Sequence, residues 1–349
     1  MRKGSTGSSI SCRSGREELL VLAPNWLGDV VMATPFLFSL RERFPAGRIT
    51  LLCRDYTAEL YRWNAAIDSL VACTGSVRSR IAAVRAAGPR GGYDACFVLP
   101  PSFSAALVSL LSKARRRIGY GGQWKDMLLT DVLPAALWRA GHLSRSYLGL
   151  LERFTNQAVA AVPLPSVVPS ESWRETAKAV AGGKSYFVLA PGATYGSSKV
   201  WPHERYAALA KRLIGSMGWT AVLVGRREER EEASTMLASI GADGKNLAGA
   251  LSLAELISVL RGAEVAIGND SGPVHVAAAL GVPAVAVFGP TSVDWTAPRG
   301  VSVRIVRGAI ECAPCFKRRC PQGAPECLAR VDADDVYAAA VSLIEEGLR

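Results

Sequence analysis

Long apolar runs, histidine and negative charge are all scarce in this chain of 349 residues. No apolar run approaches the roughly 18 residues that a membrane-spanning helix needs, so no transmembrane helix is predicted. The first 16 residues lack the apolar centre of a secretory signal, and we interpret them as a frayed leader. Acidic residues number 30 against 41 basic ones, which gives a net charge of +11 and indicates an anionic partner.

Several sequence signatures are also missing. No DNA- or RNA-binding signature is present, so we predict no nucleic-acid partner; phosphorylated small molecules and anionic lipid head groups suit the charge equally well. No G-x-G-x-x-G follows a strand-like run, which argues against a dinucleotide-dependent oxidoreductase. The tripeptide Gly183-Lys184-Ser185 resembles the end of a phosphate-binding loop, but the first glycine of that motif is absent. Eight cysteines without a signal peptide indicate a reducing compartment rather than a disulfide framework.

Strand-like apolar runs without polar alternation recur along the chain, as strands that are buried on both faces do. They lie at residues 19–23, 49–53, 95–99, 186–190, 220–225, 265–268 and 283–289. A proline-spaced stretch at 162–169 separates two such series. The pattern predicts an α/β protein with two doubly wound, Rossmann-like domains that face a central cleft. We place the domains at 17–165 and 166–330, followed by a C-terminal helix at 331–349.

The first strand end that carries candidate functional residues is APNWLGDVVMATP, residues 23–35. Asp29 opens a helix here, and it could simply cap that helix or complement its dipole. It could instead act as a general base that faces the cleft, and a carboxylate needs no perturbed pKa to be ionised near neutral pH. Pro35 lies inside the apparent helix and should kink it or split it.

The second strand end is APGATYGSSKVWPHERY, residues 190–206. Its Gly-, Ser- and Thr-rich loop contains Thr194 and Lys199 and precedes a helix that should begin near Pro202. Backbone amides, a hydroxyl and an ammonium group are what a diphosphate requires. Ordinary loops have the same composition, so this loop alone is weak support.

The third strand end is GNDSGPVHVAAALGVPAVAVFGPT, residues 268–291. Pro273 suits the first turn of a helix, with Ser271 or Gly272 at the N-cap. The N-terminus of that helix would suit a phosphate. His275 could be a core histidine on an alanine-rich helix, but it shares this joint with Asp270, which favours a site.

In combination, these motifs resemble glycosyltransferase family 9, the lipopolysaccharide heptosyltransferases. The PNWLGD turn, the PGA…K-x-WP loop and the NDSG-x-x-H block follow one another in that order, over nearly the whole chain from about Leu19. The heptosyltransferase II group of the family is the most similar. The resemblance implies a GT-B architecture. It also implies inverting transfer of L-glycero-D-manno-heptose from ADP-heptose to the heptosyl-Kdo2-lipid A inner core, with no metal or other cofactor.

The resemblance also implies roles for single residues. Asp29 matches the catalytic base, and Thr194 and Lys199 match positions that contact the donor phosphates. Asp270 matches the carboxylate that holds sugar hydroxyls, beside a donor site formed by Ser271, Gly272 and His275. Asn25 and Trp26 could shape the acceptor side. The implied location is the cytoplasmic face of the inner membrane, as a peripheral protein. A different nucleotide sugar or acceptor, or a non-catalytic sugar-nucleotide-binding module, stays open.

Two clusters of residues in the sequence each allow more than one interpretation. The basic run of Lys113, Arg115, Arg116 and Arg117 is either a solvated helix end or a contact for the carboxylates and phosphates of the lipid A core. Cys312, Cys315, Cys320 and Cys327 lie within 16 residues, in the ECAPCFKRRCPQG region that resembles the type II group. They could hold a structural zinc, remain free, form a disulfide on oxidation or simply pack.

Overall fold

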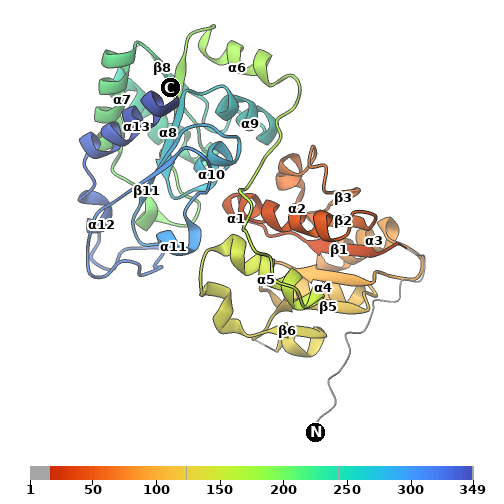
Figure 1. The fold of residues 1–349 in the computed structure, drawn as a ribbon. Coiled ribbons are helices and arrows are strands. Elements are labelled where there is room, and N and C mark those ends of the chain that lie inside the picture. Colours follow the sequence, from red (N-terminus) through yellow and green to blue (C-terminus); the bar gives the residue numbers. More distant parts are fainter. Residues whose placement is uncertain (1–15, 123, 242–243, 348–349) are drawn as a thin grey trace.

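The chain folds into two lobes, each built on a six-stranded sheet (Figure 1). This computed structural model describes residues 16–122, 124–241 and 244–347. The strand orders are β3-β2-β1-β4-β5-β6 and β12-β11-β10-β7-β8-β9, and every neighbouring pair is parallel. Counted within its own lobe, each sheet has the order 3-2-1-4-5-6, which is the Rossmann order. The predicted pair of doubly wound, Rossmann-like lobes is therefore confirmed.

The first lobe alternates strands with helices. It contains β1 (Glu18–Leu22), α1 (Leu27–Met32), α2 (Thr34–Arg43), β2 (Arg48–Cys53), η1 (Asp55–Leu60), β3 (Ser69–Ala72), α3 (Val77–Ala87), β4 (Ala95–Val98), α4 (Phe103–Leu111), β5 (Arg116–Tyr120), η2 (Lys125–Leu128), β6 (Asp131–Leu133), η3 (Ala135–Arg139) and α5 (Leu143–Thr155), where η denotes a 3-10 helix.

The second lobe follows a connecting segment between α5 and α6. It contains α6 (Trp173–Ala181), β7 (Tyr186–Ala190), η4 (Ser197–Lys199), α7 (His203–Met217), β8 (Thr220–Leu223), η5 (Arg227–Glu229), α8 (Arg230–Ile240), β9 (Gly244–Asn246), α9 (Leu253–Arg261), β10 (Val265–Asn269), α10 (Gly272–Ala279), β11 (Ala284–Phe288), α11 (Val293–Thr296), β12 (Val303–Arg307), α12 (Glu326–Ala329) and α13 (Ala333–Gly347). Helix α13 packs against α7 and the second sheet.

The central strands are apolar throughout because both faces of each sheet are covered. In β1, Leu19 and Val21 belong to the core beneath α1, α2 and α5, whereas Leu20 and Leu22 belong to the core beneath α3 and α4. Successive side chains of a strand point to opposite faces, so one uninterrupted apolar run serves both cores. This explains why the central strands were predictable as continuous apolar runs.

Pro35 splits the helix that follows β1. The first segment, α1, ends at Met32, and α2 begins at Thr34 with the proline in its first turn. Proline has no backbone N–H to donate and fits the first turn of a helix. The break shortens α1 to six residues and leaves it as a separate unit that carries Asp29.

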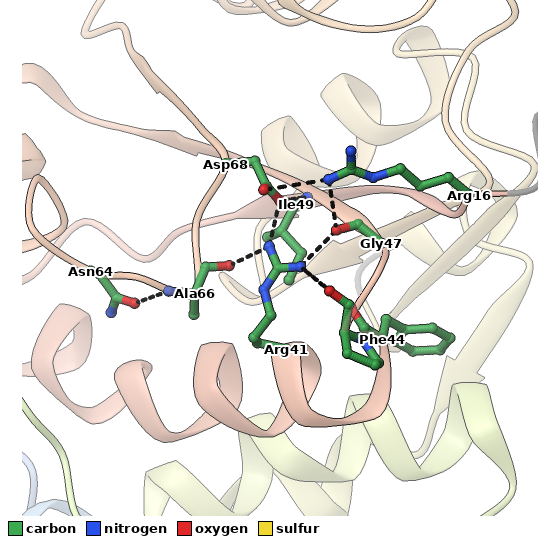
Figure 2. A network of polar contacts seen from close by, with 9 residues as sticks. Arg16, Arg41, Phe44, Gly47, Ile49, Asn64, Ala66 and Asp68 are labelled. Carbon is green, nitrogen blue, oxygen red and sulfur yellow. Dashed lines mark hydrogen bonds and ion pairs between the residues drawn. The ribbon is translucent and has the colours of Figure 1, made fainter.

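A polar network around Arg41 fixes the amino end of the first sheet (Figure 2). The Arg41 guanidinium donates to the carbonyl oxygen of Gly47 (2.7 Å) and to that of Ala66 (3.1 Å), and it forms an ion pair with Asp68. Asp68 also accepts a hydrogen bond from the Ile49 amide at 2.7 Å. Partial burial alone would raise the pKa of Asp68, but this amide bond and the Arg41 charge lower it. The network joins α2 to the starts of β2 and β3.

Within the part of the chain that the structure describes, no helix is both long enough and apolar enough to cross a membrane. The leader predicted at residues 1–16 lies outside the described residues except for Arg16, which donates to Asp68.

Candidate active site

The two lobes meet where the amino ends of α1 and α10 pack together. Gly28 of α1 lies against the His275 ring; a Cβ atom added there would be 3.1 Å from His275 Cδ2. Gly272 of α10 lies against Leu27, and an added Cβ would be 2.6 Å from its Cβ. Glycine at both positions lets the two backbones approach closely. Each helix begins just after the carboxyl end of a strand, where ligands of such sheets bind.

A cavity of ≈ 370 Å³ opens between the lobes at this junction. Its volume is in the range of small-molecule sites. The first lobe contributes Trp26, Leu27, Gly28, Asp29, Met32 and Arg139. Among other residues, the second lobe contributes the polar, charged and aromatic side chains of Thr194, Tyr195, Lys199, Glu229, Asp270, Ser271, His275, Thr291, Trp295 and Phe316. The cavity therefore unites the three strand-end motifs that the sequence singled out.

Asp29 lies in the first turn of α1, and it is partly accessible from the cavity. Among the described residues its carboxylate has no hydrogen-bond partner, and the N-cap of α1 is Trp26, without a side-chain cap. Desolvation by the surrounding protein raises the pKa of Asp29 to about 6, although His275 and Lys199 act in the opposite direction. The role predicted for Asp29 from the sequence required no shift of its pKa. A pKa nearer neutrality makes the carboxylate a stronger base.

Asp270, at the carboxyl end of β10, contacts three different side chains in the cavity. Its Oδ2 lies 2.5 Å from Lys199 Nζ and accepts a hydrogen bond from Thr291 Oγ1 at 2.6 Å. Its Oδ1 lies 3.5 Å from His275 Nε2. Burial alone would raise the pKa of Asp270, but the hydrogen bond with His275 and the charge of Lys199 lower it to about 2. Asp270 is therefore a permanently ionised anchor rather than a proton acceptor.

The loop that carries Lys199 is held by the neighbouring Asn269, which is fully buried. The Asn269 amide group donates to the carbonyl oxygen of Pro191 at 2.5 Å, and its Oδ1 accepts from the Trp201 amide at 3.0 Å and from the Tyr206 hydroxyl at 3.1 Å. One side chain thus joins the ends of β7 and β10 to the start of α7. This explains why asparagine precedes the aspartate at this joint.

Two buried polar atoms beside Asp270 lack a partner among the residues that the structure describes. These atoms are the Ser271 hydroxyl and His275 Nδ1, and Ser271, although it is the N-cap residue of α10, makes no capping bond. Buried polar groups are rarely left without a partner. Together with the free amides at a helix N-terminus, these atoms indicate a site prepared for a polar, negatively charged ligand.

A cation–aromatic contact that sequence reasoning missed also bridges the lobes. The Arg139 guanidinium, from η3, lies 4.5 Å from the ring centre of Trp295 and 5.1 Å from that of Phe316. Nearby, His142 Nε2 lies 2.9 Å from the carbonyl oxygen of Ala297. No local motif marks these residues, because partners more than 150 positions apart meet only in the folded chain.

The structure does not bring every predicted site residue into this cavity. Trp26 and Thr194 line it, but Asn25 lines a separate small hollow nearby. The basic run lies at the amino end of β5 and comprises Lys113, Arg115, Arg116 and Arg117. The cavity lies at the opposite, carboxyl ends of the parallel strands. Arg116 forms an ion pair with Asp131 and stacks on Phe154, and Arg117 donates to the carbonyl oxygen of Leu128. These contacts stabilise the lobe.

Cys327 lies in α12, and the other three clustered cysteines lie in the loop between β12 and α12, which supports the Lys199 loop. Phe316 and Lys317, inside this loop, accept hydrogen bonds at 2.5 Å from the Tyr195 and Ser198 hydroxyls. Cys312, Cys315, Cys320 and Cys327 are free thiols. Within the described ranges, no three His, Cys, Asp or Glu side chains are placed to hold a metal ion.

Two Rossmann-like lobes, with ionisable groups from both in the cleft between them, are the arrangement of a GT-B glycosyltransferase. The family profile described as glycosyltransferase family 9 (heptosyltransferase) matches residues 84–324. Lipopolysaccharide heptosyltransferase 2 of Salmonella typhimurium is 30% identical over 311 residues, which cover 83% of this chain and 88% of the relative. The chain belongs to glycosyltransferase family 9 and is a heptosyltransferase.

Solved structures agree with this assignment. The structure of Escherichia coli ADP-heptose lps heptosyltransferase II has a TM-score of 0.81 and 27% identity, and the match covers 95% of this chain and all of the other. A family 9 glycosyltransferase from Veillonella parvula has a TM-score of 0.83 at 23% identity, covering 97% of this chain and 100% of that one. The second likeness concerns the fold alone.

Proposed function

We propose that this enzyme transfers L-glycero-D-manno-heptose from ADP-heptose to the heptosyl-Kdo2-lipid A inner core of lipopolysaccharide, with inversion at the anomeric carbon. The names of its relatives supply the substrate classes. The observation that carries the proposal is the pairing of Asp29, with its raised pKa, with the unpartnered polar groups of α10 in the same cavity.

In the proposed reaction Asp29 is the general base. It removes the proton of an acceptor hydroxyl as that oxygen attacks the anomeric carbon of the donor. The bond between that carbon and the diphosphate breaks on the opposite side, and ADP departs with the electron pair. A single displacement of this kind inverts the configuration. The raised pKa of Asp29 supports this role, because a general base is most effective when its pKa lies near the pH at which the enzyme works.

The second lobe holds the donor in this proposal. The diphosphate lies at the amino end of α10, where the Ser271 hydroxyl makes no hydrogen bond within the described residues and the first amide groups of a helix have no intrahelical acceptor. Lys199 supplies a positive charge to the departing ADP while its ammonium also stays bonded to Asp270. Thr194 lines the same part of the cavity. Asp270 and His275 position this polar cluster and the sugar hydroxyls.

We also propose that the first lobe rests on the cytoplasmic face of the inner membrane. Large apolar side chains are exposed after the carboxyl ends of its strands: Trp26, Tyr56, Phe103, Trp124 and Met127. Trp124 and Met127 are 83% and 81% exposed. Aromatic side chains favour the interface between lipid and water, and a net charge of +11 favours an anionic surface. This edge is also the one that faces the cavity.

Calorimetric titration with ADP-heptose, UDP-sugars and GDP-sugars tests the donor. We expect tight binding of ADP-heptose and binding of the UDP- and GDP-sugars that is at least tenfold weaker. Equal affinity for all three would contradict the donor assignment and favour a family 9 transferase that uses another sugar nucleotide.

A further inference from the structure

A second, smaller hollow of ≈ 30 Å³ lies beside the cavity at the carboxyl edge of the first sheet. Its walls come from the ends of β1, β2 and β4 and from α3 and α4. Strands β1 and β4 are neighbours at the position where the strand order of this sheet reverses. In open parallel sheets that switch point is where ligands bind. The hollow can hold a small polar group or about one water molecule.

The polar groups of the hollow are positive or neutral. Arg54, Arg80, Asn25, Ser102 and Ser104 line it, and none of its described lining residues is acidic. Arg54 donates to Asn25 Oδ1 at 3.1 Å and to the carbonyl oxygen of Thr74 at 2.7 Å. Both acceptors are neutral, so they orient the guanidinium without balancing its charge.

Arg80 is the more unusual of the two arginines. Its Nε is buried and has no hydrogen-bond partner within the described ranges. In the described chain it forms no ion pair; burial and the nearby positive charge of Arg54 both lower the pKa of Arg80. Arg80 is partly buried, and a cation that loses part of its contact with water without gaining a counter-charge is disfavoured. A bound oxyanion would reduce that cost through charge-assisted hydrogen bonds.

The hollow and Asp29 share one loop. Ala23 and Asn25 line the hollow, whereas Trp26 and Asp29 line the main cavity. Asn25 and Asp29 are four positions apart in the sequence, so their Cα atoms are at most roughly 14 Å apart. An oligosaccharide whose reacting hydroxyl lies at Asp29 can therefore reach the hollow with a neighbouring substituent.

We propose that Arg80 and Arg54 form an oxyanion subsite for the acceptor, which binds a carboxylate or phosphate of the inner core while the reacting hydroxyl lies at Asp29. This inference rests on the function proposed above. The subsite determines which hydroxyl of the acceptor lies at Asp29. It binds the acceptor and does not bind ADP-heptose.

Steady-state kinetics with Arg80→Gln tests the subsite. We expect the KM for the acceptor to rise about 10- to 100-fold, as for the loss of a hydrogen bond to a charged group. The KM for ADP-heptose should stay within about twofold. Arg78→Gln, on the exposed face of α3 two residues away, is the matched control and should leave both values unchanged. Equal acceptor KM values in the two variants would overturn the inference.

Modified acceptors identify the anion. One has its carboxylates reduced to alcohols and the other has its phosphates removed. Removing the anionic group that the subsite binds should raise the acceptor KM of the wild-type enzyme. The same modification should not raise the acceptor KM of Arg80→Gln any further. If both modifications affect the variant as strongly as the wild type, the subsite does not bind the acceptor.

A second substitution leaves the arginines in place. Ser104→Glu puts a carboxylate into the hollow at the first turn of α4, where an acidic residue is favourable. It should raise the acceptor KM, whereas the neutral Ser104→Gln should raise it much less. If the wild-type enzyme transfers no heptose at all, the proposed function fails and this inference with it. Normal transfer with an unchanged KM in Ser104→Glu refutes the subsite only.

Discussion

Replacing Asp29 with asparagine should remove activity and stabilise the fold at the same time. A pKa of about 6 against the ordinary 3.8 corresponds to about 3 kcal/mol of unfavourable ionisation in the folded state. Because Asp29 is partly accessible from the cavity, we expect about half of this value. The folded-state pKa lies above the unfolded value, so the penalty is fully present above pH 6 and disappears as the pH falls towards 4.

The test compares thermal unfolding of Asp29→Asn and the wild type at pH 8 and at pH 4.5. At pH 8 the variant should melt several degrees higher, since 1 kcal/mol shifts Tm by about 2–4 °C in domains of this size. At pH 4.5 the difference should fall to about a third of its value at pH 8, because Asp29 is then mostly protonated in the folded state but still mostly ionised in the unfolded state. Transfer at pH 8 should fall about 10²- to 10⁴-fold, and the wild-type rate should fall as the pH drops below about 6. A stabilisation that is equal at both pH values would refute the reasoning.

Three further changes test other parts of the structure. Gly272→Ala places a Cβ 2.6 Å from that of Leu27, so α1 and α10 must separate; kcat should fall at least tenfold, and a normal kcat would refute the close contact. Ser271→Ala should leave the unfolding free energy nearly unchanged, because the hydroxyl has no protein partner, and should weaken ADP-heptose binding about fivefold by calorimetry. Arg41→Ala should destabilise the fold by about 1–3 kcal/mol in urea without changing either KM. Because Arg41 lowers the pKa of Asp68, this loss should be largest above about pH 4 and shrink below it.

The central strands could be predicted from the sequence, and the peripheral ones could not. Both faces of β1, β4, β7, β10 and β11 are buried, so each consists mainly of one apolar run, with polar residues only at an end, such as Glu18 in β1 and Asn269 in β10. Strand β5 begins with two arginines, and β9 consists of only Gly244, Lys245 and Asn246. Strand β12, at an edge, has two arginines among its five residues. Strands that are short or partly exposed do not form a continuous apolar run.

The candidate site divides in the same way. Asp29, Lys199 and Asp270 each follow a central strand, so strand prediction and residue chemistry together located them. The stacking of Arg139 on Trp295 and Phe316 depends on how the lobes meet, and no local pattern encodes it. The bond between Lys199 and Asp270 is also tertiary. The raised pKa of Asp29 depends on the protein around it, which the sequence of α1 alone does not reveal.

The most direct test of the central claim is a transfer assay with purified protein, ADP-heptose and the heptosylated lipid A acceptor. Mass spectrometry of the acceptor and quantification of ADP follow both products. The account predicts one added heptose for each ADP released with the wild type, and neither product in appreciable amount with Asp29→Asn, which should still bind ADP-heptose. Release of ADP without a heavier acceptor, or full transfer by Asp29→Asn, would contradict it.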